Sequence, residues 1–222
     1  DFTFRGKIFQ PPSDPGRWPE WREALHEWRG KQRRELSYDD SLYEKPAFRW
    51  ASSCYSCCFA MLWDQQIWDH EAGRFTVDDF LEDARRRFGG FDGILLWHAY
   101  PIIGYGPRNQ WDYYRDMPGG LDGLRQLTRE FHRHGVKVFI DYNPWDTETR
   151  REKRSDVDML VHIVKSIEAD GIFLDTIAGA GGELRTKLDA VRPGVVLEPE
   201  HTAPLEKIHD HHMSWAQWYR DS

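Results

Sequence analysis

The sequence has few cysteines and none of the glycine-rich loops that bind nucleotide phosphates. Its three cysteines, Cys54, Cys57 and Cys58, form one C-x-x-C-C cluster, which excludes a disulfide framework and lacks the four ligands of a structural zinc site. The stretch at residues 179–182, Gly-Ala-Gly-Gly, has neither the dinucleotide-binding nor the Walker spacing. We therefore expect no cofactor, and buried free thiols in or near a strand, which favour a cytoplasmic setting.

Long apolar runs and a basic excess are also missing. No run approaches the roughly 20 residues that span a bilayer. Lys+Arg number 30 against 37 Asp+Glu, a net charge of −7, which argues against nucleic acid or an anionic membrane as the partner. No N-terminal stretch resembles a secretory signal, although a chain that opens at Asp1 leaves a removed leader possible. The oligomeric state is left open.

Aromatic residues, in contrast, are abundant. The chain has 11 Trp, 9 Tyr and 12 Phe, together 14% of its residues. A sugar ring stacks its flat apolar face on such side chains, whereas the alternative explanation is simple packing in a large core. Aromatics at strand ends favour sugar binding.

The hydropathy pattern divides the chain into residues 1–45 and 46–222. The first part holds a turn-rich linker and an amphipathic helix near residues 19–36, which predicts an N-terminal helical extension. The second part alternates strands and helices. We expect strands at 57–63, 91–97, 136–141, 171–175 and 195–200, with a possible sixth at 213–219. We expect helices after a capping box at Thr76, over 121–134, after Ser155, over 183–191 and near Leu205, and a long loop over 99–120.

This alternation predicts an α/β fold, a (β/α)₈ TIM-type barrel. Units of about 25–30 residues fit such a barrel, which typically needs about 250 residues. Six units are visible, so we expect the barrel to be incomplete at its C-terminus. A doubly wound open sheet is the alternative, although its usual glycine-rich turn after the first strand is missing.

Carboxylates end the strands that should neighbour one another. Side chains alternate along a strand, so Asp175 shares a face with Phe173, Glu200 shares one with Glu198, and Asp141 shares one with Asn143. A single acid at a strand end often caps the next helix. Acids aligned on three consecutive strands instead predict a functional rim, because repulsion and desolvation make such a cluster costly.

Several motifs of this part resemble those of the α-amylase-like and α-galactosidase-like glycoside hydrolase barrels. They cover about residues 48–222 and comprise Gly93-Ile-Leu-Leu, Gly119-Gly-Leu-Asp-Gly-Leu, His134-Gly-Val-Lys-Val-Phe-Ile-Asp-Tyr-Asn-Pro and Asp170-Gly-Ile-Phe-Leu-Asp. The resemblance implies that Asp175 is the nucleophile. The acid/base would be Glu200 or Glu198 by the amylase-like pattern and Asp221 by the galactosidase-like pattern. The chain departs from both at Phe173, where these families carry Arg or Lys.

We therefore expect a glycosidase that uses two carboxylates, Asp175 and Glu200, on a carbohydrate or glycoconjugate. The resemblance favours a retaining route, with the raised pKa on Glu200 as the acid. The candidate substrate-binding residues are Asp141, Asn143, His98, Tyr142, Trp145 and Glu198.

Two other functions remain open. One is a carbohydrate-binding, degenerate barrel without turnover. The other is a metal-dependent hydrolase that uses the cluster His209-Asp-His-His212, although the first strand lacks the H-x-H of such enzymes. We expect these histidines to be solvated and no metal to be bound.

Overall fold

The structure is a computed structural model that describes residues 2, 4, 9–98, 107–145 and 151–215. The chain divides into two compact units, Asp1–Asp40 and Ser41–Ser222. The first unit contains the short helix η1 (Pro15–Arg17) and the helix α1 (Trp18–Glu35), which confirms the predicted helix. The rings of Phe4 and Phe9 pack on Trp28 of α1, with centroids 5.9 and 4.7 Å away. Phe4 and Phe9 thus pack on the apolar stripe of α1.

The second unit is built on a five-stranded parallel sheet with the order β1-β4-β5-β6-β7. Each strand pairs with the next one of this series, so the sheet winds in one direction, whereas a doubly wound sheet reverses its order. Within the described residues the sheet is open at β1 and β7, and the complete barrel stays a prediction. The strands are β1 (Cys57–Met61), β4 (Gly93–Trp97), β5 (Lys137–Tyr142), β6 (Gly171–Leu174) and β7 (Val196–Pro199).

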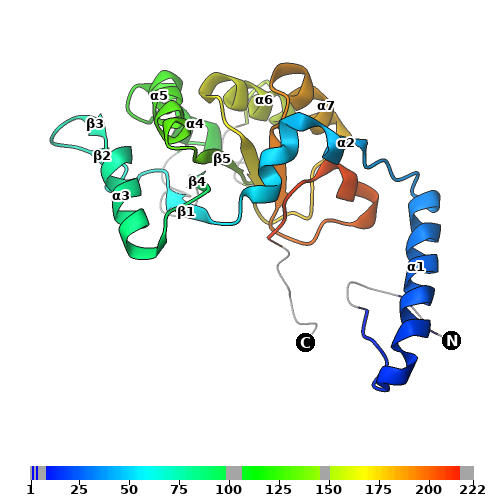
Figure 1. Cartoon of the computed structure of the whole chain (residues 1–222). Coiled ribbons are helices and arrows are strands. Elements are labelled where there is room, and N and C mark those ends of the chain that lie inside the picture. The colour runs from blue at the N-terminus through cyan, green and yellow to red at the C-terminus, as the bar shows by residue number, and fades with distance from the viewer. Residues whose placement is uncertain (1, 3, 5–8, 99–106, 146–150, 216–222) are drawn as a thin grey trace. The chain divides into compact units, whose positions relative to one another are not determined.

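Helices separate these strands, and α5, α6 and α7 lie over one face of the sheet (Figure 1). Their apolar stripes pack on alternate strand residues such as Leu96, Ile140 and Ile172, which are all fully buried. The helices of this unit are α2 (Ser41–Glu44), η2 (Pro46–Ser53), α3 (Val77–Phe88), α4 (Gln110–Arg115), α5 (Gly120–Arg133), α6 (Asp156–Ile167), α7 (Gly182–Val191) and η4 (Leu205–Asp210).

The predicted helix starts are correct, but one of the two expected caps is not. Ser155 Oγ accepts a hydrogen bond of 3.1 Å from the Asp158 N–H, as an N-cap should. Thr76 makes no such bond, because its hydroxyl donates to the Gln66 carbonyl at 2.7 Å. The capping box predicted at Thr76 is therefore wrong, although α3 begins there.

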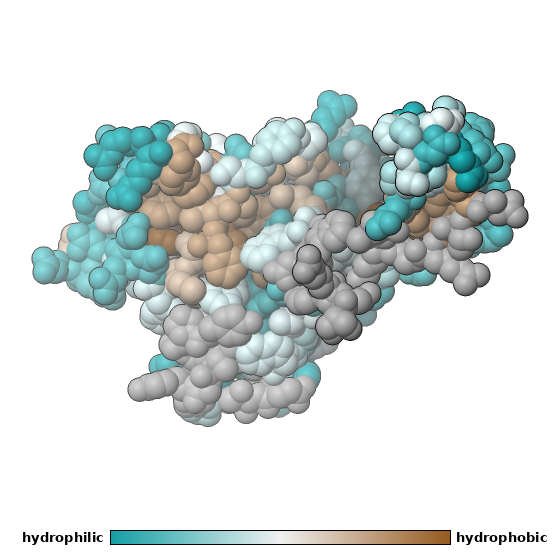
Figure 2. Space-filling model, turned by 90° about the horizontal axis from the view of Figure 1, so that it is seen from below, coloured by the Kyte–Doolittle hydropathy of each residue, from teal (hydrophilic) through white to brown (hydrophobic). Residues whose placement is uncertain are grey.

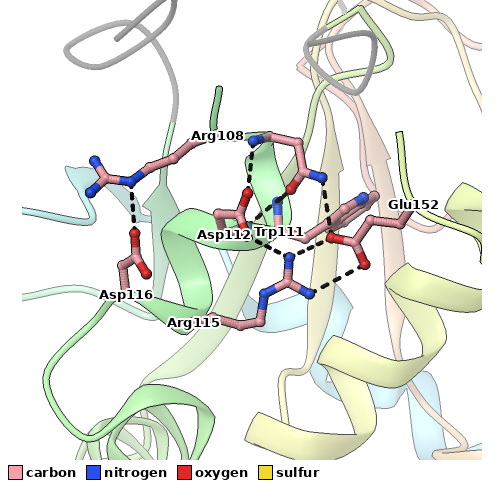
Figure 3. Close-up of polar contacts among 7 residues, drawn as sticks. Arg108, Trp111, Asp112, Arg115, Asp116 and Glu152 are labelled. Atoms are coloured by element: carbon pink, nitrogen blue, oxygen red, sulfur yellow. Dashed lines mark hydrogen bonds and ion pairs between the residues drawn. The ribbon is translucent and has the colours of Figure 1, made fainter. Parts of the chain in front are cut away.

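The helix α4 lies within the segment that we expected to be a loop. Its N-cap Asn109 and Asp112 form a reciprocal capping box, with Asp112 Oδ2 accepting from the Asn109 N–H at 3.0 Å. Arg115 then binds both Asp112, at 2.8 Å, and Glu152 (Figure 3). This network fixes α4 beside the chain that precedes α6. The rest of the expected loop, residues 99–106, lies outside the described residues.

Two more differences from the expected elements concern strands. A small antiparallel hairpin, β2 (Trp68–Asp69) and β3 (Arg74–Phe75), was not expected. The possible sixth strand does not form over residues 213–215, and its remainder lies outside the described residues. The Trp215 N–H nevertheless donates to the Pro199 carbonyl at 3.1 Å, so Trp215 lies beside the end of β7.

The face of the sheet away from the helices is concave. Phe59 on β1 and Trp215 beside β7 come from opposite edges, yet their ring centroids are 5.8 Å apart. Neighbouring strands lie about 4.8 Å apart, so the edges of a flat five-stranded sheet would be about 19 Å apart. The sheet must therefore curl. Figure 2 shows a hydrophobic area on this side, as seen from below Figure 1.

Two findings bear on the cysteines and on membranes. Cys57 and Cys58 lie in β1 and Cys54 precedes it, and all three are free thiols. Only Cys54 is buried, so the expectation of buried thiols is wrong for Cys57, whose edge strand is unpaired on one side. Among the described helices, none has the length and apolar content to cross a membrane.

Candidate active site

Asp175 and Glu200 lie directly beyond the carboxyl ends of β6 and β7, and their carboxyl groups are in hydrogen-bonding contact. Burial, followed by the contact with Glu200, raises the pKa of Asp175 to about 6. The charged form is disfavoured because two carboxylates side by side repel each other away from water. The raised pKa thus belongs to a carboxyl group that is only 4% exposed.

Two neutral donors oppose this effect at Asp175. Asn143 Nδ2 donates to Asp175 Oδ2 at 2.8 Å, and the Trp97 indole N–H acts on the same carboxyl group electrostatically. Both lower its pKa, because they stabilise the ionised form. Asp175 is therefore held in place by the ends of β4 and β5 as well as by Glu200.

Glu200 is held by the backbone. Its Oε2 accepts a hydrogen bond of 2.6 Å from the N–H of Thr176, the residue after Asp175. Thr176 has φ 62°, in the left-handed region that a β-branched residue rarely adopts. Such strain persists where the surroundings impose it, often at functional sites. Here the turn directs one N–H at the partner of Asp175.

Glu198 lies one level deeper on the concave face. It pairs in register with Phe173, two residues before Asp175. Its side chain is buried, Oε2 has no hydrogen-bond partner in the described part of the chain, and burial raises its pKa to about 7. Glu198 is thus a carboxyl group that is about half protonated near pH 7.

His98 and Asp141 occupy the same buried level. His98 Nδ1 lies 3.5 Å from Asp141 Oδ2, and neither side chain is exposed. Asp141 is the register partner of Phe173, which places it beside the level of Glu198. Burial lowers the pKa of His98 to about 3, so the imidazole is neutral.

Gln110 of α4 determines the tautomer of His98. Its Oε1 accepts from the Asn143 N–H at 3.0 Å and its Nε2 donates to the Asn143 carbonyl at 2.7 Å, which fixes the amide orientation. His98 Nε2 lies 3.2 Å from the same Oε1 and must therefore carry the proton. The unprotonated Nδ1 then faces Asp141.

The two remaining predicted residues lie elsewhere. The Tyr142 hydroxyl donates to Asp156 Oδ2 at 2.9 Å, and its ring stacks on Trp111, so its side chain packs on the helical side of the sheet. Trp145 is 42% exposed, and its backbone N–H donates to Asn143 Oδ1 at 3.4 Å. Asp221 lies outside the described residues. The structure thus brings together Asp141, Asn143, Asp175, Glu198, Glu200 and His98, but not Tyr142.

Sequence reasoning missed three residues of this site, Trp97, Gln110 and Thr176. Trp97 could have been found, since alternation along its strand puts it on the same face as Leu95. The capping pattern Asn109-x-x-Asp112 would have revealed the helix that presents Gln110. The strain at Thr176 has no signal in the sequence.

The histidine cluster is packed instead of solvated, so that expectation is wrong. His211 is 4% exposed, its Nδ1 donates to the Lys207 carbonyl at 2.7 Å, and its Nε2 accepts from the Ala180 N–H at 3.2 Å. His212 stacks on Phe48 at a centroid distance of 3.9 Å. Among the described residues, no group of three or more His, Cys, Asp or Glu side chains could hold a metal ion.

Comparisons with known proteins give distant likenesses. No protein-family model matches the sequence, and no curated protein sequence matches it. The structure is similar to parts of an α-amylase from Geobacillus thermoleovorans complexed with acarbose (17% identity, 68% of this chain, 47% of that one, TM-score 0.44), of AsfvAP:AG (15%, 66%, 48%, 0.39) and of a β-arabinopyranosidase (18%, 72%, 25%, 0.39). The chain spans less than half the length of each. At these TM-scores the likenesses establish no common fold.

Proposed function

We propose that this protein is a glycosidase in which Asp175 and Glu200 cleave the glycosidic bond of a carbohydrate or glycoconjugate. The observation that supports it best is the contact between the two carboxyl groups at the ends of neighbouring parallel strands. We also propose that the curved sheet belongs to a TIM-type barrel, whose active sites lie at this end of the strands.

In the proposed reaction Asp175 is the nucleophile. Its carboxylate attacks the anomeric carbon while Glu200 donates a proton to the departing glycosidic oxygen, which leaves as an alcohol. Glu200 then takes a proton from water, and the resulting hydroxide displaces Asp175 and releases the sugar. With a pKa of about 6, Asp175 is mostly ionised at neutral pH.

The direct interaction between the carboxyl groups of Asp175 and Glu200 favours retention of configuration over inversion. Retaining glycosidases hold the two groups about 5–5.5 Å apart, whereas inverting ones need about 6.5–9.5 Å to admit a water molecule. Groups in direct contact leave no space for that water until they separate. Asn143, Asp141 and His98 are buried beside the pair, where they help to position it, and exposed Trp145 supplies a ring surface for the sugar.

A screen of aryl glycosides tests the proposal with wild type, Asp175→Asn, Glu200→Gln and the exposed control Asp79→Asn. We expect Asp79→Asn to match wild type and both site variants to lose at least about 100-fold in kcat/KM. Equal rates for wild type and Asp175→Asn would show that Asp175 is not the nucleophile.

Azide rescue separates the two roles. In Asp175→Gly, azide should replace the nucleophile and give a glycosyl azide of inverted configuration. In Glu200→Gly, azide should intercept the glycosyl-enzyme and give the retained configuration. The opposite pattern would exchange the two assignments.

A carbohydrate-binding protein without turnover is the second candidate. Phe173 favours it, because this residue is buried and apolar where the resembling families carry a cation. Sugar binding without hydrolysis of any glycoside in the screen would favour this function.

A further inference from the structure

Four aromatic side chains line the concave face below the acid pair. The ring of Phe173 lies 4.3 Å from that of Trp215, and Phe59 lies 4.8 Å from Trp97 and 5.8 Å from Trp215. Trp97 and Phe173 are buried, whereas Phe59 and Trp215 are each 40% exposed. The buried pair therefore supports an exposed apolar surface formed by Phe59 and Trp215.

Glu198 supplies a polar group at the same depth. It is 5% exposed, and alternation along β7 directs it to the concave face, since Val196 packs in the aromatic cluster and Leu197 packs on the helical side. A buried carboxyl oxygen without a partner is costly, and the hydroxyl group of a ligand would satisfy it.

The acidic residues of this region disfavour anionic ligands. Asp141, Asp175, Glu198 and Glu200 all lie on this face or at its rim. Among the described residues, the largest influences on the pKa of Asp175 and Glu198 include no lysine or arginine. An anionic ligand would meet repulsion here, whereas a neutral ring with an apolar face would not.

We propose that Trp215 and Phe59 form a subsite for a neutral sugar ring, with Glu198 hydrogen-bonded to one of its hydroxyl groups. The ring lies against the exposed aromatic surface, and uronic acid or sulfated sugars are disfavoured. This assignment rests on the proposed function for the position of the ring next to Asp175 and Glu200.

The test measures binding to the full chain by saturation-transfer NMR and calorimetry. The ligands are the methyl glycosides of neutral hexoses and of the corresponding uronic acids. The variants are Trp215→Ala, Trp215→Phe, Phe59→Ala and Glu198→Gln, with Trp18→Ala as a matched control for an exposed tryptophan in the other unit.

We expect at least one neutral glycoside to bind about tenfold more tightly than its uronic counterpart, and Trp215→Ala to weaken it by about tenfold. Trp215→Phe should retain most of the affinity, and Trp18→Ala should match wild type. Circular dichroism checks folding, and the comparison of neutral and uronic ligands needs only the wild-type protein.

Equal or tighter binding of uronic glycosides would overturn the inference, as would unchanged affinity in a folded Trp215→Ala or no binding of any neutral glycoside. The hydrolysis screen distinguishes this failure from that of the proposed function. Binding of neutral sugars without hydrolysis refutes the glycosidase alone. Hydrolysis confined to uronides refutes the neutral subsite alone.

Discussion

Asn143 donates its side-chain N–H to Asp175 Oδ2 over 2.8 Å, and this bond joins the ends of β5 and β6 inside the protein. Because the donor favours the ionised carboxyl, Asn143→Ala should raise the pKa of Asp175 above about 6, by about one pH unit. The carboxyl carbon resonance of Asp175 followed against pH measures this. The exposed control Gln126→Ala should leave the curve unchanged, and an identical curve for Asn143→Ala would contradict the prediction.

The pH dependence of activity should distinguish the two roles of Asp175. If Asp175 is the nucleophile, it must be ionised, so kcat/KM should fall as the pH drops below about 6. If it is the general acid, kcat/KM should fall as the pH rises above that value. The pH profile of kcat/KM on an aryl glycoside decides, and we expect the first outcome. Because the carboxyl groups of Asp175 and Glu200 interact, the apparent pKa of the fall in kcat/KM belongs to the pair and not to one residue.

Glu198 should make the protein less stable at higher pH. Its pKa rises from 4.5 when unfolded to about 7 when folded, so the folded state binds more protons between these values. The free energy of unfolding therefore falls as the pH rises through this window. Glu198→Gln should match wild type near pH 4.5 and exceed it at pH 8 by up to about 3 kcal/mol.

Urea denaturation at both pH values measures the difference. The exposed variant Glu206→Gln serves as the control and should follow wild type throughout. A constant offset between Glu198→Gln and wild type at both pH values would show that packing, and not ionisation, causes the change.

Gly171 on β6 should not tolerate a methyl group. A Cβ there would lie 2.2 Å from Phe139 Cδ1, on the face that supports the site. Gly171→Ala should lower the free energy of unfolding by about 1–3 kcal/mol, the usual cost of overpacking. At Gly181 a Cβ would have no atom within 4 Å, so Gly181→Ala should stay close to wild type. Denaturation curves compare the two, and equal losses would contradict the packing argument.

Periodicity and strand-end chemistry predicted the parts of the fold that depend on local sequence. The strands, the main helices and the shared face of Asp141, Asn143, Asp175 and Glu198 follow from alternation. The alternation that placed Asp141 and Asn143 on one face also turns Tyr142 to the other.

The missed features depend on contacts between distant segments. The raised pKa of Asp175 comes from burial and from the Glu200 carboxyl group, and the packed His211 depends on the Ala180 N–H from another loop. Thr76 prefers a carbonyl ten residues away to its own helix end. None of these can be inferred from spacing along the chain.

The capping network of α4 has a consequence for how the acid pair responds to its surroundings. Glu152 accepts a hydrogen bond from Asn109, the residue before Gln110. The Gln110 side chain in turn binds both the N–H and the carbonyl group of Asn143. Asn143 donates to Asp175 and lowers the pKa of its carboxyl group. Hydrogen bonds and the backbone of α4 thus connect a partly exposed ion pair to the carboxyl group of Asp175. A change that displaces Glu152 should therefore also change the pKa of Asp175.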